Sequence, residues 1–133
     1  MTFLDKALQL SIKLKPSNSN QQYDVFSFVF DRNKLISVGT NNMLSTSYKA
    51  YKIGKQFKVR RLLAFPFRHA ELDAISKLIG KHYISGREKI VVVRLGKKNQ
   101  PLLAKPCTAC QELLGAFNLN RVWYTNNQGF ETL

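Results

Sequence analysis

The sequence has few cysteines and no long apolar segment. Only Cys107 and Cys110 occur among its 133 residues, which excludes a scaffold of several disulfides. No apolar run approaches the roughly 20 residues of a membrane-spanning helix, so we expect no membrane partner. Residues 1–6 lack a basic segment followed by an apolar stretch, and no secretory signal is expected. These absences predict a cytoplasmic protein whose two cysteines serve metal or redox chemistry.

Acidic residues are scarce and unevenly placed. The chain has 8 Asp and Glu against 21 Lys and Arg, which gives a formal net charge of +13. No acidic residue lies between Asp31 and Glu71. The cations of that window are Arg32, Lys34, Lys49, Lys52, Lys55, Lys58, Arg60, Arg61 and Arg68. Because clustered cations attract phosphates, this charge indicates a phosphorylated or polyanionic partner. The alternative is that the lysines only keep the protein soluble.

The length and the order of the expected elements predict the fold class. At 133 residues the chain is long enough for one domain with a core, over residues 1–133, and too short for two. Hydrophobic periodicity and turn residues predict the elements. We expect helices at 3–14, 69–79 and 107–117, strands at 23–30, 34–38, 90–93, 121–125 and 130–133, a polar loop at 17–22, and a long basic connection at 40–68. This order predicts an α/β fold, a three-layer α/β/α sandwich around a mixed, roughly five-stranded sheet.

Two short motifs carry the chemistry. His69-Ala70-Glu71 and Pro106-Cys107-Thr108-Ala109-Cys110 each lie at the start of an expected helix. The spacing of the two cysteines places both sulfurs on one helix face, and the helix N-terminus favours the thiolate. One histidine and two cysteines are three zinc ligands, and no fourth is evident. A structural zinc takes four protein ligands, whereas a catalytic zinc takes three and leaves one position open. The pattern therefore predicts a catalytic zinc site.

Glu71 lies two residues after the histidine, and we interpret it as a general acid and base. Each motif alone is weak, because H-x-E is common by chance. A lone C-x-x-C is also found in redox pairs and in halves of zinc ribbons. The joint pattern, with a buried strand between the motifs, favours the zinc site.

Together, H-x-E and P-C-x-x-C form the signature of zinc-dependent nucleobase deaminases. From about Tyr23 to Tyr124 the chain resembles the cytidine/deoxycytidylate deaminase superfamily. A histidine in the first motif is more similar to the deoxycytidylate, tRNA-adenosine and polynucleotide-editing branches. A short antiparallel strand at 130–133 is more similar to the compact free-nucleoside type. The resemblance also implies a homo-oligomer, as in many relatives.

The resemblance implies roles for individual residues. His69, Cys107 and Cys110 would bind Zn²⁺, and Glu71 would move protons during a hydrolysis by zinc-activated water. The backbone N–H of Ala70 would help to hold the base.

Two further residues follow from the resemblance. Asn41, in Gly39-Thr40-Asn41, would contact the sugar or base, with Asn42 as the alternative register. Tyr124 would lie against the base, or it is an ordinary strand tyrosine.

Three hypotheses remain for the function. In the first, the chain deaminates cytosine in a free pyrimidine nucleotide such as deoxycytidylate. The phosphate would then be held by cations of the basic connection: Lys58, Arg60, Arg61 or Arg68. In the second, it deaminates cytosine in single-stranded DNA or RNA, with aromatics stacking on bases and lysines tracking phosphates. Those aromatics are Tyr48, Tyr51, Phe57, Phe65 and Phe67. In the third, it is a non-catalytic module that keeps zinc for stability, which the presence of Glu71 argues against.

Overall fold

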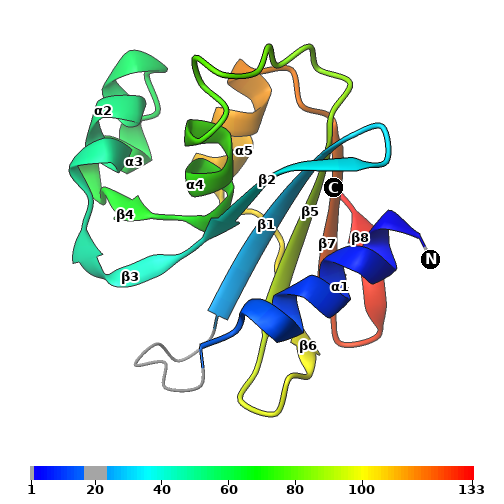
Figure 1. The fold of residues 1–133 in the computed structure, drawn as a ribbon. Coiled ribbons are helices and arrows are strands. Elements are labelled where there is room, and N and C mark those ends of the chain that lie inside the picture. The colour runs from blue at the N-terminus through cyan, green and yellow to red at the C-terminus, as the bar shows by residue number, and fades with distance from the viewer. Residues whose placement is uncertain (1, 17–23) are drawn as a thin grey trace.

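A computed structural model describes residues 2–16 and 24–133 (Figure 1). The expected polar loop at 17–22 and Tyr23, the first residue of the first expected strand, lie outside the described residues. Within the described ranges, no helix combines the length and hydropathy needed to cross a lipid bilayer.

One mixed sheet forms the centre of the fold (Figure 1). Its strand order is β2-β1-β5-β7-β8, and the short β6 pairs with β5. The strands are β1 (Asp24–Asp31), β2 (Lys34–Thr40), β5 (Lys89–Leu95), β6 (Pro101–Leu102), β7 (Arg121–Asn126) and β8 (Gly129–Thr132). Only β5 and β7 pair in parallel, while the other neighbours are antiparallel. The expected mixed sheet of about five strands is confirmed, with β6 as an addition.

Helices cover both faces of this sheet, so the three-layer arrangement is confirmed. Helix α1 (Phe3–Leu14) packs on one face, while α4 (Ala70–Ser76) and α5 (Thr108–Ala116) cover the other (Figure 1). The central strand β5 alternates between the two cores: Val91 and Val93 face α1, and Ile90 and Val92 face α4 and α5. A strand buried on both faces reads as a continuous apolar run, as Ile90–Val93 does.

The prediction of an irregular connection over residues 40–68 is wrong. The segment forms β3 (Asn42–Thr46), α2 (Tyr48–Gln56), α3 (Arg60–Ala64) and β4 (Phe67–Arg68). These elements lie together at the left of Figure 1, with β3 paired to β4. The buried residues of helix α2 are Ala50, Ile53 and Gly54. They form one narrow stripe, and the rest of the helix surface is not buried. The apolar face of α2 is covered by α3, so tertiary packing stabilises a helix that carries little apolar surface of its own.

The helix expected at 69–79 is shorter than predicted. His69 is the N-cap of α4, and the helix ends at Ser76. Residues 77–81 form turns, and Gly80 has a positive φ of 82°. Ile79, the last residue of the expected helix, is 38% exposed, because the chain has already left the helical path there.

Candidate active site

The two sequence motifs meet at the N-termini of two neighbouring helices. His69 is the N-cap of α4, in extended backbone, and its carbonyl accepts the Asp73 N–H at 2.9 Å. Cys107 is the N-cap of α5, directly after Pro106, and its carbonyl accepts the Gln111 N–H at 2.9 Å. Both motifs therefore begin helices, as expected, and α4 packs on α5.

Three side chains at this junction form a group that could hold a metal ion. The ligand atoms of His69, Cys107 and Cys110 all lie within 4.8 Å of one another. His69 Nδ1 is 3.7 Å from Cys107 Sγ, and both cysteines are free thiols. Sulfur and nitrogen atoms bound to one tetrahedral ion at about 2.0–2.3 Å are separated by about 3.5–4 Å. The donor types and their spacing thus fit a zinc ion.

The thiols have opposite pKa shifts. The Cys110 thiol donates a hydrogen bond to Cys107, which with His69 lowers the pKa of Cys107 to about 3 although partial burial opposes the shift. The same hydrogen bond and burial raise the pKa of Cys110. The bond to Cys107 also raises the pKa of His69. Cys107 is therefore a thiolate at neutral pH, which is the form that binds metal.

Glu71 projects from the first turn of α4 and is only 5% exposed. Burial raises the pKa of its carboxyl, and the charge on His69 partly opposes that shift. A carboxyl with a raised pKa beside a metal-ligating group is suited to accepting and returning protons.

A cavity of about 300 Å³ lies over this junction. His69, Glu71 and Cys107 line it together with Ala70 of α4. Val92 of β5 contributes to its wall from the central sheet. Three of the four residues expected to carry the chemistry are thus brought to one cavity, while the fourth, Cys110, is 1% exposed.

Asn41 lies at the edge of the same cavity. Its Oδ1 accepts the Val25 N–H at 3.1 Å, which ties the residue after β2 to the start of β1. A Cβ atom at Gly39 would overlap the carbonyl oxygen of Ala70 in α4. The glycine therefore lets β2 approach α4 closely, and this approach brings Asn41 to the cavity. Asn42, the alternative to Asn41 as the substrate-contacting residue, is not favoured. Its side chain accepts the Leu44 N–H at 3.0 Å, and it lines only the neighbouring pocket.

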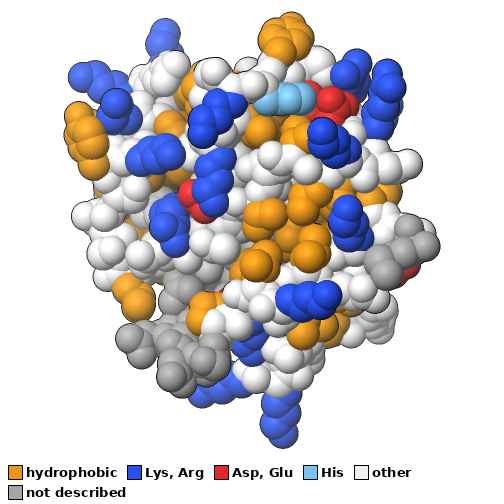
Figure 2. All heavy atoms as spheres, viewed as in Figure 1, with side chains coloured by type: hydrophobic (Ala, Val, Ile, Leu, Met, Phe, Trp, Pro, Cys, Tyr) orange, Lys and Arg blue, Asp and Glu red, His pale blue; other side chains and the backbone are white. Residues whose placement is uncertain are grey.

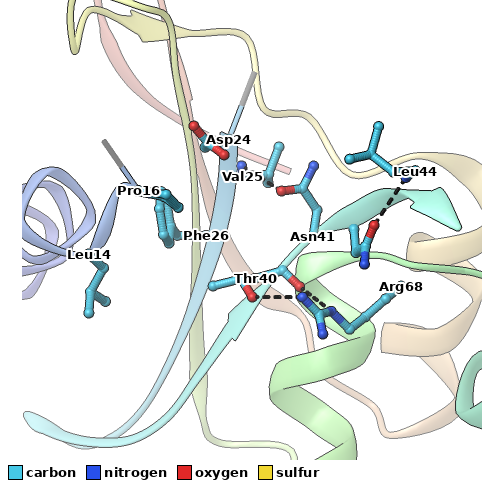
Figure 3. A pocket seen from close by; sticks show the side chains of 10 residues that line it. Leu14, Pro16, Asp24, Val25, Phe26, Thr40, Asn41, Leu44 and Arg68 are labelled. Carbon is cyan, nitrogen blue, oxygen red and sulfur yellow. Dashed lines mark hydrogen bonds between the residues drawn. The ribbon is translucent and has the colours of Figure 1, made fainter. Parts of the chain in front are cut away.

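That neighbouring pocket, of about 290 Å³, shares Val25 and Asn41 with the first cavity (Figure 3). Arg68 lies on its polar side, where Nε donates to the Thr40 carbonyl at 3.1 Å and Nη2 to Thr40 Oγ1 at 3.3 Å. Leu14, Pro16 and Phe26 form the apolar side, and Asp24 also lines the pocket. Arg68 is therefore placed beside the candidate active site and outside its cavity.

Three other predicted residues are not brought to the cavity. Arg60 and Arg61 are exposed on α3. Tyr124 is buried in the core between the sheet and α5. It pairs with Glu131 across β7 and β8, and the hydrogen bond to Glu131 raises the pKa of its phenol. None of the three is among the described residues that line the cavity.

Two cations that sequence reasoning missed do line the cavity, Arg94 and Lys105. Side chains alternate between the two faces of β5, so Arg94 lies on the same face as Ile90 and Val92. This alternation could have pointed to Arg94 from the sequence. Lys105 lies two residues before Cys107, but the path of that loop could not be read from the sequence.

Comparisons with known proteins agree with this arrangement at the level of the fold. No model of a protein family matches the sequence, and no curated protein matches it. Solved structures do match. The cytidine deaminase from Burkholderia pseudomallei is similar over 97% of this chain and 89% of its own, with a TM-score of 0.58 and 15% identity. The cytidine deaminase from Mycobacterium leprae is similar over 97% and 88%, with a TM-score of 0.49 and 18% identity. The similarity to the Burkholderia pseudomallei structure shows that the chain has the cytidine deaminase fold, and the resemblance in its motifs is confirmed at that level.

Proposed function

We propose that the protein is a zinc-dependent hydrolytic deaminase that converts cytosine to uracil in a free cytidine or deoxycytidine nucleotide. We treat residues 1–133 as one deaminase domain. The observation that carries the proposal is one cavity lined by His69, Glu71 and Cys107 and backed by Cys110, on a fold shared with a cytidine deaminase.

His69, Cys107 and Cys110 would hold the metal. Their chemistry fits Zn²⁺, because imidazole and thiolate are its preferred ligands and three of them leave one position open. Bound there, Zn²⁺ supplies Lewis-acid activation of the attacking water.

Glu71 is the proton-transfer group of the reaction. Its carboxylate accepts a proton from the attacking water as the oxygen bonds to C4 of cytosine. It returns that proton to ring N3, and the proton of the hydroxyl now on C4 then passes through Glu71 to the exocyclic amine, which leaves. The bond between C4 and the exocyclic nitrogen then breaks, ammonia leaves, and a C4 carbonyl remains. The buried position of Glu71 favours this exchange, because burial raises the pKa of its carboxyl and so favours proton uptake.

Ala70 and Asn41 are proposed to hold the substrate. The Ala70 N–H belongs to the first turn of α4 and has no partner within the helix, so it is suited to bonding an oxygen of the base. The Asn41 side chain is oriented by its bond to Val25 and lies at the cavity edge, where an amide can bond the base or sugar.

A second candidate is deamination of cytosine in single-stranded nucleic acid. The surface of α2 and the turn after α3 favour it, because Tyr48 is 76% exposed and Phe65 is 68% exposed. Lys52 lies over the Tyr48 ring at 5.8 Å, and Arg60 and Arg61 are exposed on α3. Exposed aromatics among cations are typical of surfaces that bind single strands. A non-catalytic module is disfavoured, because metal binding alone does not need the buried carboxylate of Glu71.

The test is ammonia release by the zinc-loaded protein from cytidine, deoxycytidine, their 5′-monophosphates and a cytosine-containing single-stranded oligonucleotide. We expect turnover of the monophosphates, and we expect Glu71→Gln to lower it by about 10²–10⁴-fold with zinc retained. Glu112→Gln is the matched control, because Glu112 is an exposed carboxylate on α5. Equal activity of wild type and Glu71→Gln would refute the role of Glu71. Turnover of the oligonucleotide alone would replace the first candidate with the second.

A further inference from the structure

Two cations line the candidate catalytic cavity on the side of β5 and the loop before α5. Arg94 lies near the end of β5 and Lys105 lies two residues before Cys107, and both contribute to the cavity wall. Neither belongs to the basic segment at 40–68, which the sequence indicated as the source of phosphate ligands.

The Arg94 side chain is held in place by the segment that follows β5. Its Nη1 donates to the Leu103 carbonyl at 3.3 Å. The backbone N–H of Arg94 is fixed separately, by a bond to Thr125 Oγ1 of β7 at 3.1 Å. Leu103 lines the same cavity. A guanidinium that is already oriented loses little conformational entropy when it binds a ligand. It also presents a fork of donors that matches the oxygens of a phosphate.

The charge balance of this cavity favours an anion beside the reacting base. Glu71 is the one carboxylate among the described residues that line it, and the reaction engages Glu71 with the base. The neighbouring pocket is less suited to a phosphate, because the carboxylate of Asp24 lines it.

We propose that Arg94 and Lys105 bind the phosphate group of the cytosine nucleotide and so set a preference for nucleotide over nucleoside. The inference rests on the proposed function and names the phosphate-binding part of the same site. A cavity of about 300 Å³ is at the lower end of the range for small-molecule sites, and it is sized for one nucleotide unit. The phosphate is that of a free monoester or of one link in a strand.

The experiment measures binding without turnover. Calorimetric titration of the full, zinc-loaded chain carrying Glu71→Gln gives the Kd of deoxycytidine and of its 5′-monophosphate. We expect the monophosphate to bind about tenfold more tightly or better, as for a charge-assisted pair. Adding Arg94→Gln should remove most of that ratio, about five- to tenfold, and Lys105→Gln about two- to threefold. Arg94→Lys, which keeps the charge without the fork of donors, should keep part of it.

Two control variants remove the same charge elsewhere. Arg121 and Lys98 are exposed and lie outside the cavity, so Arg121→Gln and Lys98→Gln should leave the ratio unchanged. Thermal unfolding confirms that each variant is folded. Lys105 is exposed, so Lys105→Gln tests the phosphate site without disturbing the contact of Arg94 with Leu103. Three results would overturn the inference. They are equal binding of nucleoside and nucleotide, no binding of either, and a control variant that lowers the ratio as much as Arg94→Gln does.

Two further arms separate the remaining alternatives. The methyl phosphodiester of deoxycytidine 5′-monophosphate distinguishes the source of the phosphate: weaker binding than the monoester assigns a free nucleotide, and equal binding assigns a strand. Ammonia release by the wild-type protein is measured separately. A phosphate preference that depends on Arg94, without release of ammonia, would support the phosphate site and refute the proposed deamination.

Discussion

At the scale of single residues, the site depends on side chains whose surroundings change their protonation. Cys107 and Cys110 have the same side chain, yet Cys107 is exposed at a helix N-cap and Cys110 is buried one turn later. The hydrogen bond between them lowers the pKa of Cys107 and raises that of Cys110. Glu71, two residues after His69, is buried and has a raised pKa. One junction thus provides both a ready thiolate ligand and a carboxyl that can exchange protons.

Glu88 gives a prediction for stability against pH, away from the candidate active site. It is 1% exposed and accepts the N–H groups of Ser85 at 3.1 Å and Gly86 at 2.9 Å, while His82 Nε2 is 3.4 Å away. Burial opposes its ionisation, but the hydrogen bonds prevail and lower the pKa of Glu88 below 4.5. The carboxylate therefore stabilises the fold above pH 4.5, and this contribution is lost as the pH falls through the folded-state pKa.

We expect Glu88→Gln to lower the free energy of unfolding at pH 7 by about 1–3 kcal/mol. The difference from wild type should shrink as the pH falls through the folded-state pKa of Glu88, which lies below 4.5, because Glu88 then takes up a proton and is uncharged like Gln. Urea unfolding from pH 7 to pH 3 measures this, with the exposed Glu112→Gln as the control. A difference that is independent of pH would contradict the explanation.

The grouping of His69, Cys107 and Cys110, with Glu71 nearby, was predictable from the sequence because two local motifs specify it. Arg94 and Lys105 were not, because their contribution to the cavity depends on how the end of β5 meets the loop before α5. Tyr124 shows the converse case. Its position after the cysteine helix suggested a place against the base, but its strand pairs with β8 and its hydroxyl bonds Glu131.

At the scale of elements, the packing of β2 on α4 positions the site. A Cβ at Gly39 would overlap the backbone of Ala70 and Ala74, so only glycine permits this approach. Ser37 Oγ donates to the Ala74 carbonyl at 2.7 Å, and Asp73 accepts the Thr40 N–H at 3.0 Å. The N-cap of the same helix is His69, and the distance of α4 from β2 therefore sets where Asn41 lies relative to the candidate metal ligands.

Gly39→Ala tests this packing. We expect it to lower the free energy of unfolding by about 1–3 kcal/mol, because the added methyl group forces α4 away from β2. Gly115→Ala is the matched control, since Gly115 lies within α5 with nothing near its Cβ position, and it should stabilise the fold by about 0.5–1 kcal/mol. Urea denaturation measures both. A Gly39→Ala protein as stable as the Gly115→Ala protein would show that the close approach is not required.

Helices and strands were predictable where the sequence carries a clear hydrophobic pattern. Strand β5 is buried on both faces, and α1 has a regular apolar stripe. The elements were not predictable over residues 40–68. Helix α2 buries only three of its nine residues, and its N-cap Ser47, which accepts the Ala50 N–H at 3.2 Å, is a weak signal by itself. Its stability comes from α3 and from the core beneath, which no local window of sequence contains.

At the scale of the whole molecule, the order of helices and strands predicted the layered sheet. The direction of the last strand is the feature that the sequence analysis linked to the compact type of this fold. Strand β8 runs antiparallel to β7, in agreement with the expected compact end of the fold.

The net charge of +13 is also a whole-molecule property. Lys and Arg side chains are spread over the face in Figure 2, where acidic side chains show in few places. Such a surface raises the local concentration of phosphorylated ligands, and the cavity with Arg94 and Lys105 would select among them.

The most direct test of a zinc-dependent deaminase is ammonia release from deoxycytidine 5′-monophosphate before and after removal of the metal. The wild-type protein is stripped with a chelator, assayed, and assayed again after one equivalent of Zn²⁺ is added. We predict that activity is lost with the zinc and restored with it, and that Cys110→Ser neither binds the equivalent nor recovers. Full activity in the zinc-free protein, or none in a folded protein that holds one zinc per chain, would contradict the account.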